Sequence, residues 1–230
     1  TMQDQYNPKN VGTSGPKTAL IPGNLAGWHE IHDKYGTKPW ASLYTDAINH
    51  ATNGYEVTPF AEQIMTGASE RLSQMGSISQ LSDYNIQLPK AGSKIYAHKL
   101  AESLRKVAEF GPKVFYEGEI AEKIAAGCEE NGGQISIEDL HRYKPEWKEP
   151  IHIIYQDHII YGAPPNSTAF QILQTLKLLE LLEIGQYSQK SPEFLHLFLE
   201  AAKLAVSDRI EHAGDPIRNP VPVDKLLSER

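Results

Sequence analysis

The chain has 230 residues, of which 40% are hydrophobic and 22% charged, and its formal net charge at pH 7 is -7. This composition is ordinary for a globular protein. The acidic balance and the lack of a Lys/Arg run argue against nucleic-acid binding, which needs a basic patch. The apolar stretches are short and interrupted, so we expect no transmembrane helix, and residues 1–23 lack the basic start and apolar core of a signal peptide.

The first part of the chain is predicted to be irregular. Glycine and proline interrupt any periodic pattern over residues 1–17, and Thr18–Ile21 is a short strand candidate that Pro22 and Gly23 would end.

Helical patterns dominate the next hundred residues. Asn24 is a candidate cap for the first helix and Thr58 for the third, because their side chains can accept a hydrogen bond from a backbone N–H of the first turn. The predicted helices are Asn24 to Tyr35, Pro39 to Asn53, Pro59 to about Met75, Lys99 to Phe110, Val114 to Glu130, and a short turn from Ser136 to Leu140.

The pattern changes to strands after Pro150. Ile151–Tyr155 and His158–Tyr161 are rich in β-branched and aromatic residues, and they flank Gln156-Asp157. This pattern predicts a β-hairpin. A lone hairpin is only marginally stable, so we expect these strands to join a larger sheet supplied by residues outside this chain.

Two helices are predicted after the hairpin, from Thr168 to Ile184 and from Ser191 to about His212, followed by an irregular tail after Gly214. The predicted fold class is therefore α+β, mainly helical with one hairpin. We interpret residues 1–230 as a single partial domain.

The single cysteine, Cys128, excludes a disulfide within the chain and a structural zinc site built from cysteines. It lies in a helical pattern, and we predict a small buried residue rather than a reactive thiol. The low cysteine content also slightly favours a cytoplasmic location over a periplasmic or secreted one.

A metal site is conceivable on the first helix, where His29 and His32 share a face beside Asp33. No third ligand stands at a recognisable spacing, so we expect no metal site here. We expect instead that this segment is a partly exposed helix whose Trp28 and Ile31 side chains face inward.

Other candidate chemistry also has a simpler interpretation. Thr1 could act as an N-terminal nucleophile, but the polar segment after it has no strand pattern, so we take it as a chain start. Glu117, Glu119 and Glu122 fit the acidic first turn of a helix. The glycine pairs lack the spacing of a phosphate loop, and we expect no cofactor.

Several segments, in order, resemble the γ-glutamyltranspeptidase family of N-terminal-nucleophile hydrolases. Each is short, but together they extend over roughly residues 18–228. The segments are Ala19–Trp28, His32–Trp40, Ala47–Ile48, Gly54–Val57, Phe115–Ala121, Asn131–Gly133, Glu138–Leu140, Pro164–Ser167, Asp208–Arg209, Gly214–Pro216 and Val221–Val223.

The resemblance implies an αββα sandwich assembled from two subunits, of which this chain would be the central part of the large one. Such proteins are made as one precursor that cleaves itself before a threonine. The freed threonine then attacks an amide, classically the γ-glutamyl bond of glutathione, and the acyl group passes to water or an amino acid. The expected partners are therefore a small subunit carrying that threonine and a small-molecule amide substrate, with a homo-oligomer of the processed heterodimer as a further possibility.

The resemblance places the nucleophile downstream of Val221–Ser228 and the oxyanion glycines in the small subunit, so we assign no catalytic residue to this chain. The turn at Pro164, Pro165, Asn166, Ser167 and Thr168 is the candidate for a wall of the substrate pocket. Its alternative is a rigid helix-entry turn with Ser167 as a cap. For the whole chain, the alternative function is a catalytically inactive scaffold or binding module of the same fold.

Overall fold

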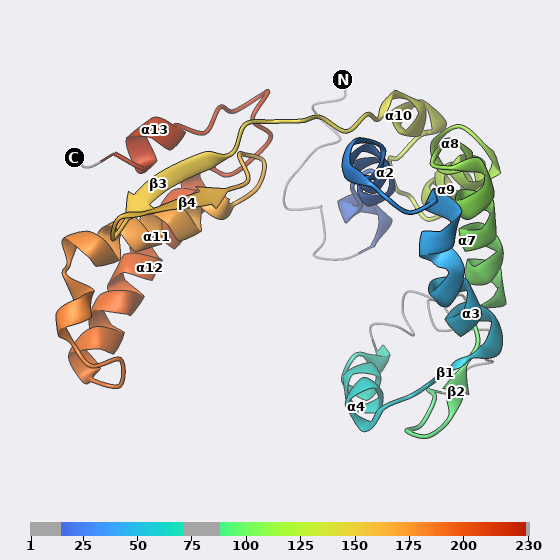
Figure 1. Ribbon diagram of the computed structural model, residues 1–230, viewed down its shortest axis with the longest axis horizontal. Coiled ribbons are helices and arrows are strands. Elements are labelled where there is room, and N and C mark those ends of the chain that lie inside the picture. Colours follow the sequence, from blue (N-terminus) through green and yellow to red (C-terminus); the bar gives the residue numbers. More distant parts are fainter. Residues whose placement is uncertain (1–14, 71–87, 229–230) are drawn as a thin grey trace. The chain divides into compact units, whose positions relative to one another are not determined.

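The computed structural model describes residues 15–70 and 88–228, which fall into two compact units, Thr1–Glu146 and Trp147–Arg230 (Figure 1). We describe each unit by itself. Unit 1 denotes the described residues up to Glu146, and unit 2 those from Trp147 onward. The single partial domain remains a prediction, and most of the predicted irregular stretch 1–17 lies outside the described residues.

Unit 1 is built mainly from helices. Two short strands pair antiparallel within it, with Tyr55 opposite Ile95 and Glu56 opposite Lys94. In chain order its elements are η2 (Pro16–Thr18), α2 (Asn24–Tyr35), η3 (Trp40–Tyr44), α3 (Thr45–Asn53), β1 (Tyr55–Glu56), α4 (Pro59–Gly67), β2 (Lys94–Ile95), α7 (His98–Phe110), α8 (Lys113–Tyr116), α9 (Glu119–Glu130) and α10 (Ile137–Arg142).

Local capping explains several helix boundaries in unit 1. The Thr58 hydroxyl accepts from the Ala61 N–H at 3.1 Å, which confirms the predicted cap of α4. Ser136 and Asp139 cap α10 reciprocally, each side chain accepting from the other's backbone N–H. By contrast, Asn24 is not a cap, because Gly23 takes that position and no side chain caps α2.

Four other predictions for unit 1 need correction. The single helix predicted from Pro39 to Asn53 is the 3-10 helix η3 followed by α3, which begins at Thr45. Thr18–Ile21 is not a strand, since the Thr18 N–H bonds to the Gly15 carbonyl and closes the 3-10 turn η2. The helix predicted from Val114 to Glu130 is two helices, α8 and α9, which are separated at Gly118, the N-cap of α9. The helix predicted from Pro59 ends at Gly67 as α4, and Met75 lies outside the described residues.

The core of unit 1 joins α2 to the helices that follow α7. Ala26, Tyr116, Ala121 and Leu140 are buried together, and half-buried apolar residues pack around them. A second small cluster joins α3 to α7 through Ala51, Ala97 and Ala101.

In unit 2 a hairpin packs on one helix, which in turn packs on a second helix. Its elements are β3 (Ile151–Tyr155), β4 (His158–Gly162), α11 (Ala169–Leu181), η4 (Ile184–Gln186), α12 (Pro192–His212) and α13 (Val223–Leu226). The short helix α13 lies within the tail predicted to be irregular.

The predicted hairpin is confirmed, with Ile153 opposite Ile160 in antiparallel register. Gln156 and Asp157 form the two-residue turn with φ of 46° and 63°, the left-handed values that suit a tight hairpin. Ile153 is buried at 5% exposure on the α11 side, whereas Ile154 and Ile159 on the other face are 62% and 54% exposed.

The helices of unit 2 pack against each other through small and aliphatic side chains. Leu179, Ile184 and Ala201 form its buried cluster, and α11 also packs against β3 and β4. Gly162 permits this approach, because a Cβ there would lie 3.0 Å from the Cβ of Ala169. The Ser191 hydroxyl caps α12 by accepting from the Phe194 N–H.

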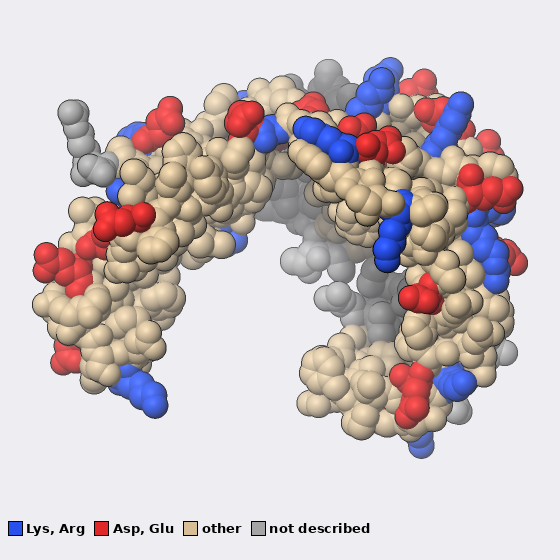
Figure 2. Space-filling model, in the orientation of Figure 1, with Lys and Arg blue, Asp and Glu red and all other residues tan. Residues whose placement is uncertain are grey.

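Charged side chains are unevenly distributed on the surface. On the face drawn in Figure 2, lysine, arginine and acidic residues lie side by side over α7 to α10, whereas unit 2 shows wide areas without charge. None of the helices in residues 15–70 and 88–228 is both long and apolar enough to cross a membrane.

Candidate functional site

The turn at Pro164–Thr168 connects β4 to α11, so all five predicted pocket-wall residues lie together at one helix entry. The Ser167 N–H donates to the Pro164 carbonyl at 3.0 Å, and the Ser167 hydroxyl accepts from the Ala169 N–H at 3.1 Å. Asn166 and Thr168 are exposed, whereas Ser167 is half-buried. The Ser167 hydroxyl therefore satisfies one backbone N–H at the start of α11, but Thr168 takes the N-cap position and no side chain caps the helix there.

A buried polar pair ties α11 to α12. The Gln174 side chain is 8% exposed, and its amide Nε2 donates to Asp208 Oδ2 at 2.5 Å. The Gln174 Oε1 is buried without a hydrogen-bond partner among the described residues. A charge-assisted hydrogen bond of this kind fixes the register of the two helices. Asp208 belongs to a segment that carries the family resemblance, but nothing in the sequence pairs it with Gln174, since only the three-dimensional packing brings the two together.

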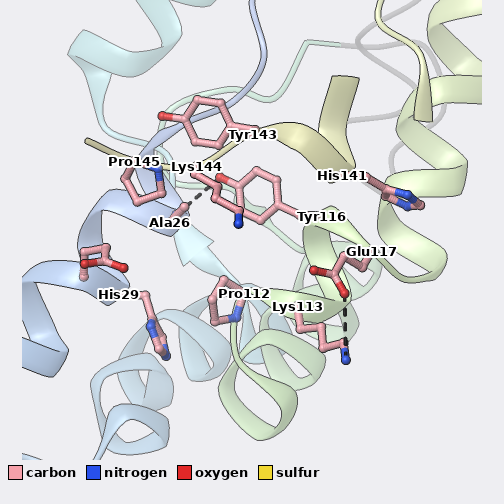
Figure 3. Close-up of a pocket in the computed structure, with 11 residues that line it drawn as sticks. Ala26, His29, Pro112, Lys113, Tyr116, Glu117, His141, Tyr143, Lys144 and Pro145 are labelled. Atoms are coloured by element: carbon pink, nitrogen blue, oxygen red, sulfur yellow. Dashed lines mark hydrogen bonds and ion pairs between the residues drawn. The ribbon is translucent and has the colours of Figure 1, made fainter. Parts of the chain in front are cut away.

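A surface cleft of about 440 Å³ lies in unit 1. It is bounded by α2, by the start of α8, and by the segment that leaves α10. Figure 3 shows Tyr116 and Lys144 near its centre, with Lys113 and Glu117 on one side and His29 on the other. The remaining lining residues are Ala26, Glu30, Pro112, His141, Tyr143 and Pro145.

Tyr116 forms the floor of this cleft and joins two of the segments that carry the family resemblance. Its hydroxyl donates to the Pro22 carbonyl at 2.5 Å and accepts from the Ala26 N–H at 3.3 Å. Burial raises the pKa of the Tyr116 hydroxyl above its ordinary value of 10.0, which favours the protonated, hydrogen-bond-donating form still further. The Tyr116 and Tyr143 rings stack with their centroids 5.6 Å apart.

Glycine is needed where Tyr143 meets the start of α2. A Cβ at Gly23 would collide with the Tyr143 hydroxyl oxygen, so no other residue fits there without a shift. Gly23 and Tyr116 therefore allow the N-terminus of α2 to pack against α8 and against the segment after α10. In the sequence, Gly23 serves only as a residue that would end the preceding strand candidate, and nothing in the local pattern indicates its packing role.

The rim of the cleft carries both signs of charge. Lys113 Nζ lies 3.8 Å from Glu117 Oε2, and His29 Nδ1 lies 3.2 Å from Oδ2 of Asp33, a residue that does not line the cleft. Such exposed pairs contribute little to stability because water screens them. The residues that line the cleft include no serine, threonine or cysteine, and its polar groups belong to lysine, glutamate, histidine and tyrosine side chains, which offer polar contacts to a ligand.

The orientation predicted for α2 is wrong. Trp28 and Ile31 are 59% and 52% exposed, whereas the His29 and His32 side chains are turned inward against the Trp40 ring, 4.9 and 5.3 Å away. His32 Nε2 lies 2.7 Å from the Lys38 carbonyl. The described residues contain no group of three potential ligands arranged to hold a metal ion.

The remaining candidates have structural roles. Cys128 is buried, as predicted, and its sulfur accepts from the Ile135 N–H at 3.3 Å. Glu119 begins α9 and pairs with Lys106 and Lys123, and the hydrogen bond from Lys106 lowers the pKa of its carboxyl. The proximity of Lys106 could not be predicted, because it belongs to another helix. Thr1 lies outside the described residues.

Comparison with known proteins identifies the family. The family model described as Gamma-glutamyltranspeptidase matches residues 1–230. This chain belongs to the γ-glutamyltranspeptidase family. The predicted resemblance is thus confirmed over the whole chain.

The relatives of this chain within the γ-glutamyltranspeptidase family are named for more than one enzyme activity. The glutathione hydrolase proenzyme of Escherichia coli is 34% identical over 231 residues, covering 99% of this chain and 40% of that protein. The acylase ACY 1 proenzyme of a Pseudomonas species (strain V22) is 32% identical over 228 residues, covering 99% of this chain and 40% of that protein. The chain thus spans about 40% of the length of these curated relatives.

Solved structures agree with the family and the fold class. The crystal structure of Helicobacter pylori γ-glutamyltranspeptidase matches with a TM-score of 0.88 at 30% identity, covering 99% of this chain and 66% of that one. The α+β class predicted from the sequence is confirmed. The relatives' names are those of hydrolases, an acylase and a transpeptidase, so the family is one of enzymes.

Proposed function

We propose that this chain is the large-subunit portion of an enzyme that hydrolyses or transfers γ-glutamyl or related amides. The nucleophile would be an N-terminal threonine, freed by autoprocessing and located outside this chain. The observation that carries the proposal is the family match over all 230 residues. The relatives that this chain matches are named as proenzymes, and they are more than twice as long as this chain.

The chemistry divides between this chain and the rest of the parent protein. A threonine hydroxyl attacks the amide carbon, the threonine's own amine takes the proton, and backbone N–H groups stabilise the oxyanion. We assign none of these groups to this chain. Its contribution would be a scaffold and, through Asn166 and Thr168 at the entrance of α11, part of the substrate-pocket wall.

The first test is autoprocessing of the full-length parent. Intact-mass spectrometry with N-terminal sequencing is expected to find two polypeptides, the second beginning with threonine. Replacing that threonine by alanine should leave a single unprocessed chain. An unprocessed wild-type protein would reject the enzyme and favour the alternative, a catalytically inactive scaffold or binding module.

The second test addresses the substrate class. The processed protein is expected to release p-nitroaniline from a γ-glutamyl anilide, whereas the 230-residue chain alone should be inert. Release by this chain alone would contradict the assignment of the nucleophile to residues outside it.

A second candidate substrate class is favoured by the similarity to the acylase ACY 1 proenzyme, which is 32% identical. The same threonine chemistry would then cleave the amide of an acyl side chain, as on a β-lactam nucleus. A processed protein that is inactive on γ-glutamyl anilide but hydrolyses an acylated β-lactam would favour this candidate. If the processed protein cleaves neither amide, both candidate substrate classes are rejected.

A further inference from the structure

The floor of the cleft in unit 1 is apolar and fixed in place. Tyr116 is 6% exposed, and its hydroxyl is bonded to two backbone groups, the Pro22 carbonyl and the Ala26 N–H. Its ring stacks on the Tyr143 ring, with an angle of 19° between the two planes. Both tyrosines line the cleft, so a ligand would meet an apolar surface that needs no rearrangement before binding.

Two prolines add to this apolar surface. Pro112 directly precedes α8 and Pro145 belongs to the segment after α10, and both line the cleft together with Tyr116 (Figure 3). The cleft volume of about 440 Å³ lies within the range of small-molecule sites. The cleft therefore has room for the body of a small organic molecule.

The acidic side chains of the cleft already have partners. Glu117 Oε2 lies 3.8 Å from Lys113 Nζ. Glu30, which belongs to α2, is also engaged in a polar interaction. Neither carboxylate is therefore a vacant partner for an incoming cation.

Two basic side chains of the cleft have no such partner. Among residues 15–70 and 88–228, no hydrogen bond or ion pair engages the Lys144 ammonium or the His141 ring. Figure 3 shows Lys144 near the centre of the cleft. An ammonium group carries a compact charge and three donors, and an imidazole can supply a further N–H donor. The cleft thus presents a cation without a counter-charge beside an apolar floor.

We propose that this cleft binds a small organic anion, in which a carboxylate or phosphate group is attached to a compact apolar body. The acid group would contact Lys144, with His141 as a second donor, and the body would lie on the Tyr116 ring. This site goes beyond the proposed function, because binding there needs neither the nucleophile nor an amide.

A molecule with both features fits the cleft better than one with a single feature. A cation would be repelled by Lys144 and would have to compete with Lys113 for Glu117. A neutral molecule would gain only from apolar contact and would leave Lys144 without a partner. A bare ion such as inorganic phosphate would leave the Tyr116 and Tyr143 rings in contact with water.

The test is protection of lysine side chains in the full-length parent protein. Reductive methylation modifies accessible lysine amines, and peptide mass spectrometry measures the rate at each position. The first probe is benzoate at about 10 mM, since so small a ligand binds with a Kd on the order of 1 mM. We expect benzoate and phenyl phosphate each to slow the modification of Lys144 by at least about fivefold. Lys99, an exposed lysine of α7 outside the cleft, should react at an unchanged rate.

Two further comparisons separate the parts of the ligand. Benzamide is the neutral counterpart of benzoate, and inorganic phosphate is an anion without an apolar body, so each should protect Lys144 less than benzoate does. Lys144→Ala should weaken benzoate binding in calorimetry by about fivefold, the loss of one partly screened ion pair. Lys144→Arg keeps the charge and should restore most of the affinity. Lys99→Ala is the matched control and should leave it unchanged.

Four outcomes would overturn the proposal. Equal modification of Lys144 with and without benzoate would mean that the cleft does not bind it. A Lys144 that is unreactive in the ligand-free parent would mean that another part of the parent fills the cleft. Equal protection by benzamide would reject the anion, and equal protection by inorganic phosphate would reject the apolar body. Since methylation needs no amide cleavage, a parent that is inactive on amides but shows the expected protection would reject the proposed function alone.

Discussion

At the scale of single residues, Tyr116 and Gly23 determine how the start of α2 sits in unit 1. Tyr116 connects the Pro22 carbonyl and the Ala26 N–H, and the helix itself provides no partner for an N–H of its first turn. Gly23 leaves room for the Tyr143 hydroxyl next to this connection. Tyr116 and Gly23 belong to segments that carry the family resemblance, and both act here through packing and hydrogen bonding rather than catalysis.

Removing the Tyr116 hydroxyl should destabilise the parent protein. In Tyr116→Phe the Pro22 carbonyl and the Ala26 N–H lose their partner, which costs about 1–3 kcal/mol. Thermal unfolding should show a lower Tm, and hydrogen exchange in the peptide that spans α2 should become faster. Tyr161→Phe is the control, since Tyr161 is 61% exposed, and it should change neither measurement.

Two glycines of the same region should respond oppositely to alanine. Gly23→Ala should lower the Tm, because its Cβ would collide with the Tyr143 side chain. Gly27→Ala should raise the stability by about 1 kcal/mol, because alanine favours the helix and no atom lies within 4 Å of that Cβ. Equal effects of the two substitutions in thermal unfolding would contradict the packing role of Gly23.

At the scale of elements, helix ends follow from local chemistry that the sequence displays. Thr58, Ser136 and Ser191 each directly precede a predicted helix, and each side chain accepts a hydrogen bond from the first turn of its helix. The hairpin is predictable for the same reason, because the turn residues and the β-branched strands on either side lie within a few positions of one another in the sequence. The determinants of all these elements are near in sequence.

The capping box of α10 should give a stability contribution that depends on pH. Hydrogen bonds from the Ser136 backbone and side chain lower the pKa of Asp139 below its ordinary value of 3.8. The folded state therefore favours the carboxylate, and its contribution is fully present well above pH 3.8 and is lost as the pH falls through the lowered pKa.

Asp139→Asn should accordingly lower the stability at pH 7 by about 0.3–1 kcal/mol, because the amide keeps an acceptor oxygen but removes the negative charge from the first turn of α10. Denaturant unfolding at pH 7 and at progressively lower pH would measure the difference between variant and wild type. The difference should shrink below pH 3.8. A difference that stays constant down to the lowest accessible pH would contradict the assigned role of the carboxylate.

At the scale of the whole molecule, large apolar side chains are exposed on both the hairpin and α12. Ile154, Ile159 and Tyr161 are more than half exposed on the hairpin, and so on α12 are Leu195, Leu199, Leu204 and Ile210. Exposed apolar patches and unpaired strand edges favour aggregation.

The 230-residue chain expressed alone should therefore be poorly soluble, whereas the full-length parent should be soluble. Size-exclusion chromatography of both proteins under the same conditions would test this. A monodisperse 230-residue chain with a cooperative thermal transition would show that these surfaces need no cover.

By itself, the sequence determined the α+β class, most helices, the hairpin and the family, because each depends on residues that are close together or on motifs in a fixed order. It did not determine which side of α2 faces inward. The local pattern favoured Trp28 and Ile31, yet His29 and His32 pack on Trp40.

Only the tertiary structure decided the contacts between distant segments. Tyr116 bonds to Pro22 across 94 positions, and Gln174 pairs with Asp208 across 34. Hydrogen bonds and close packing of this kind need two surfaces to meet at a particular angle, and no local pattern encodes that angle.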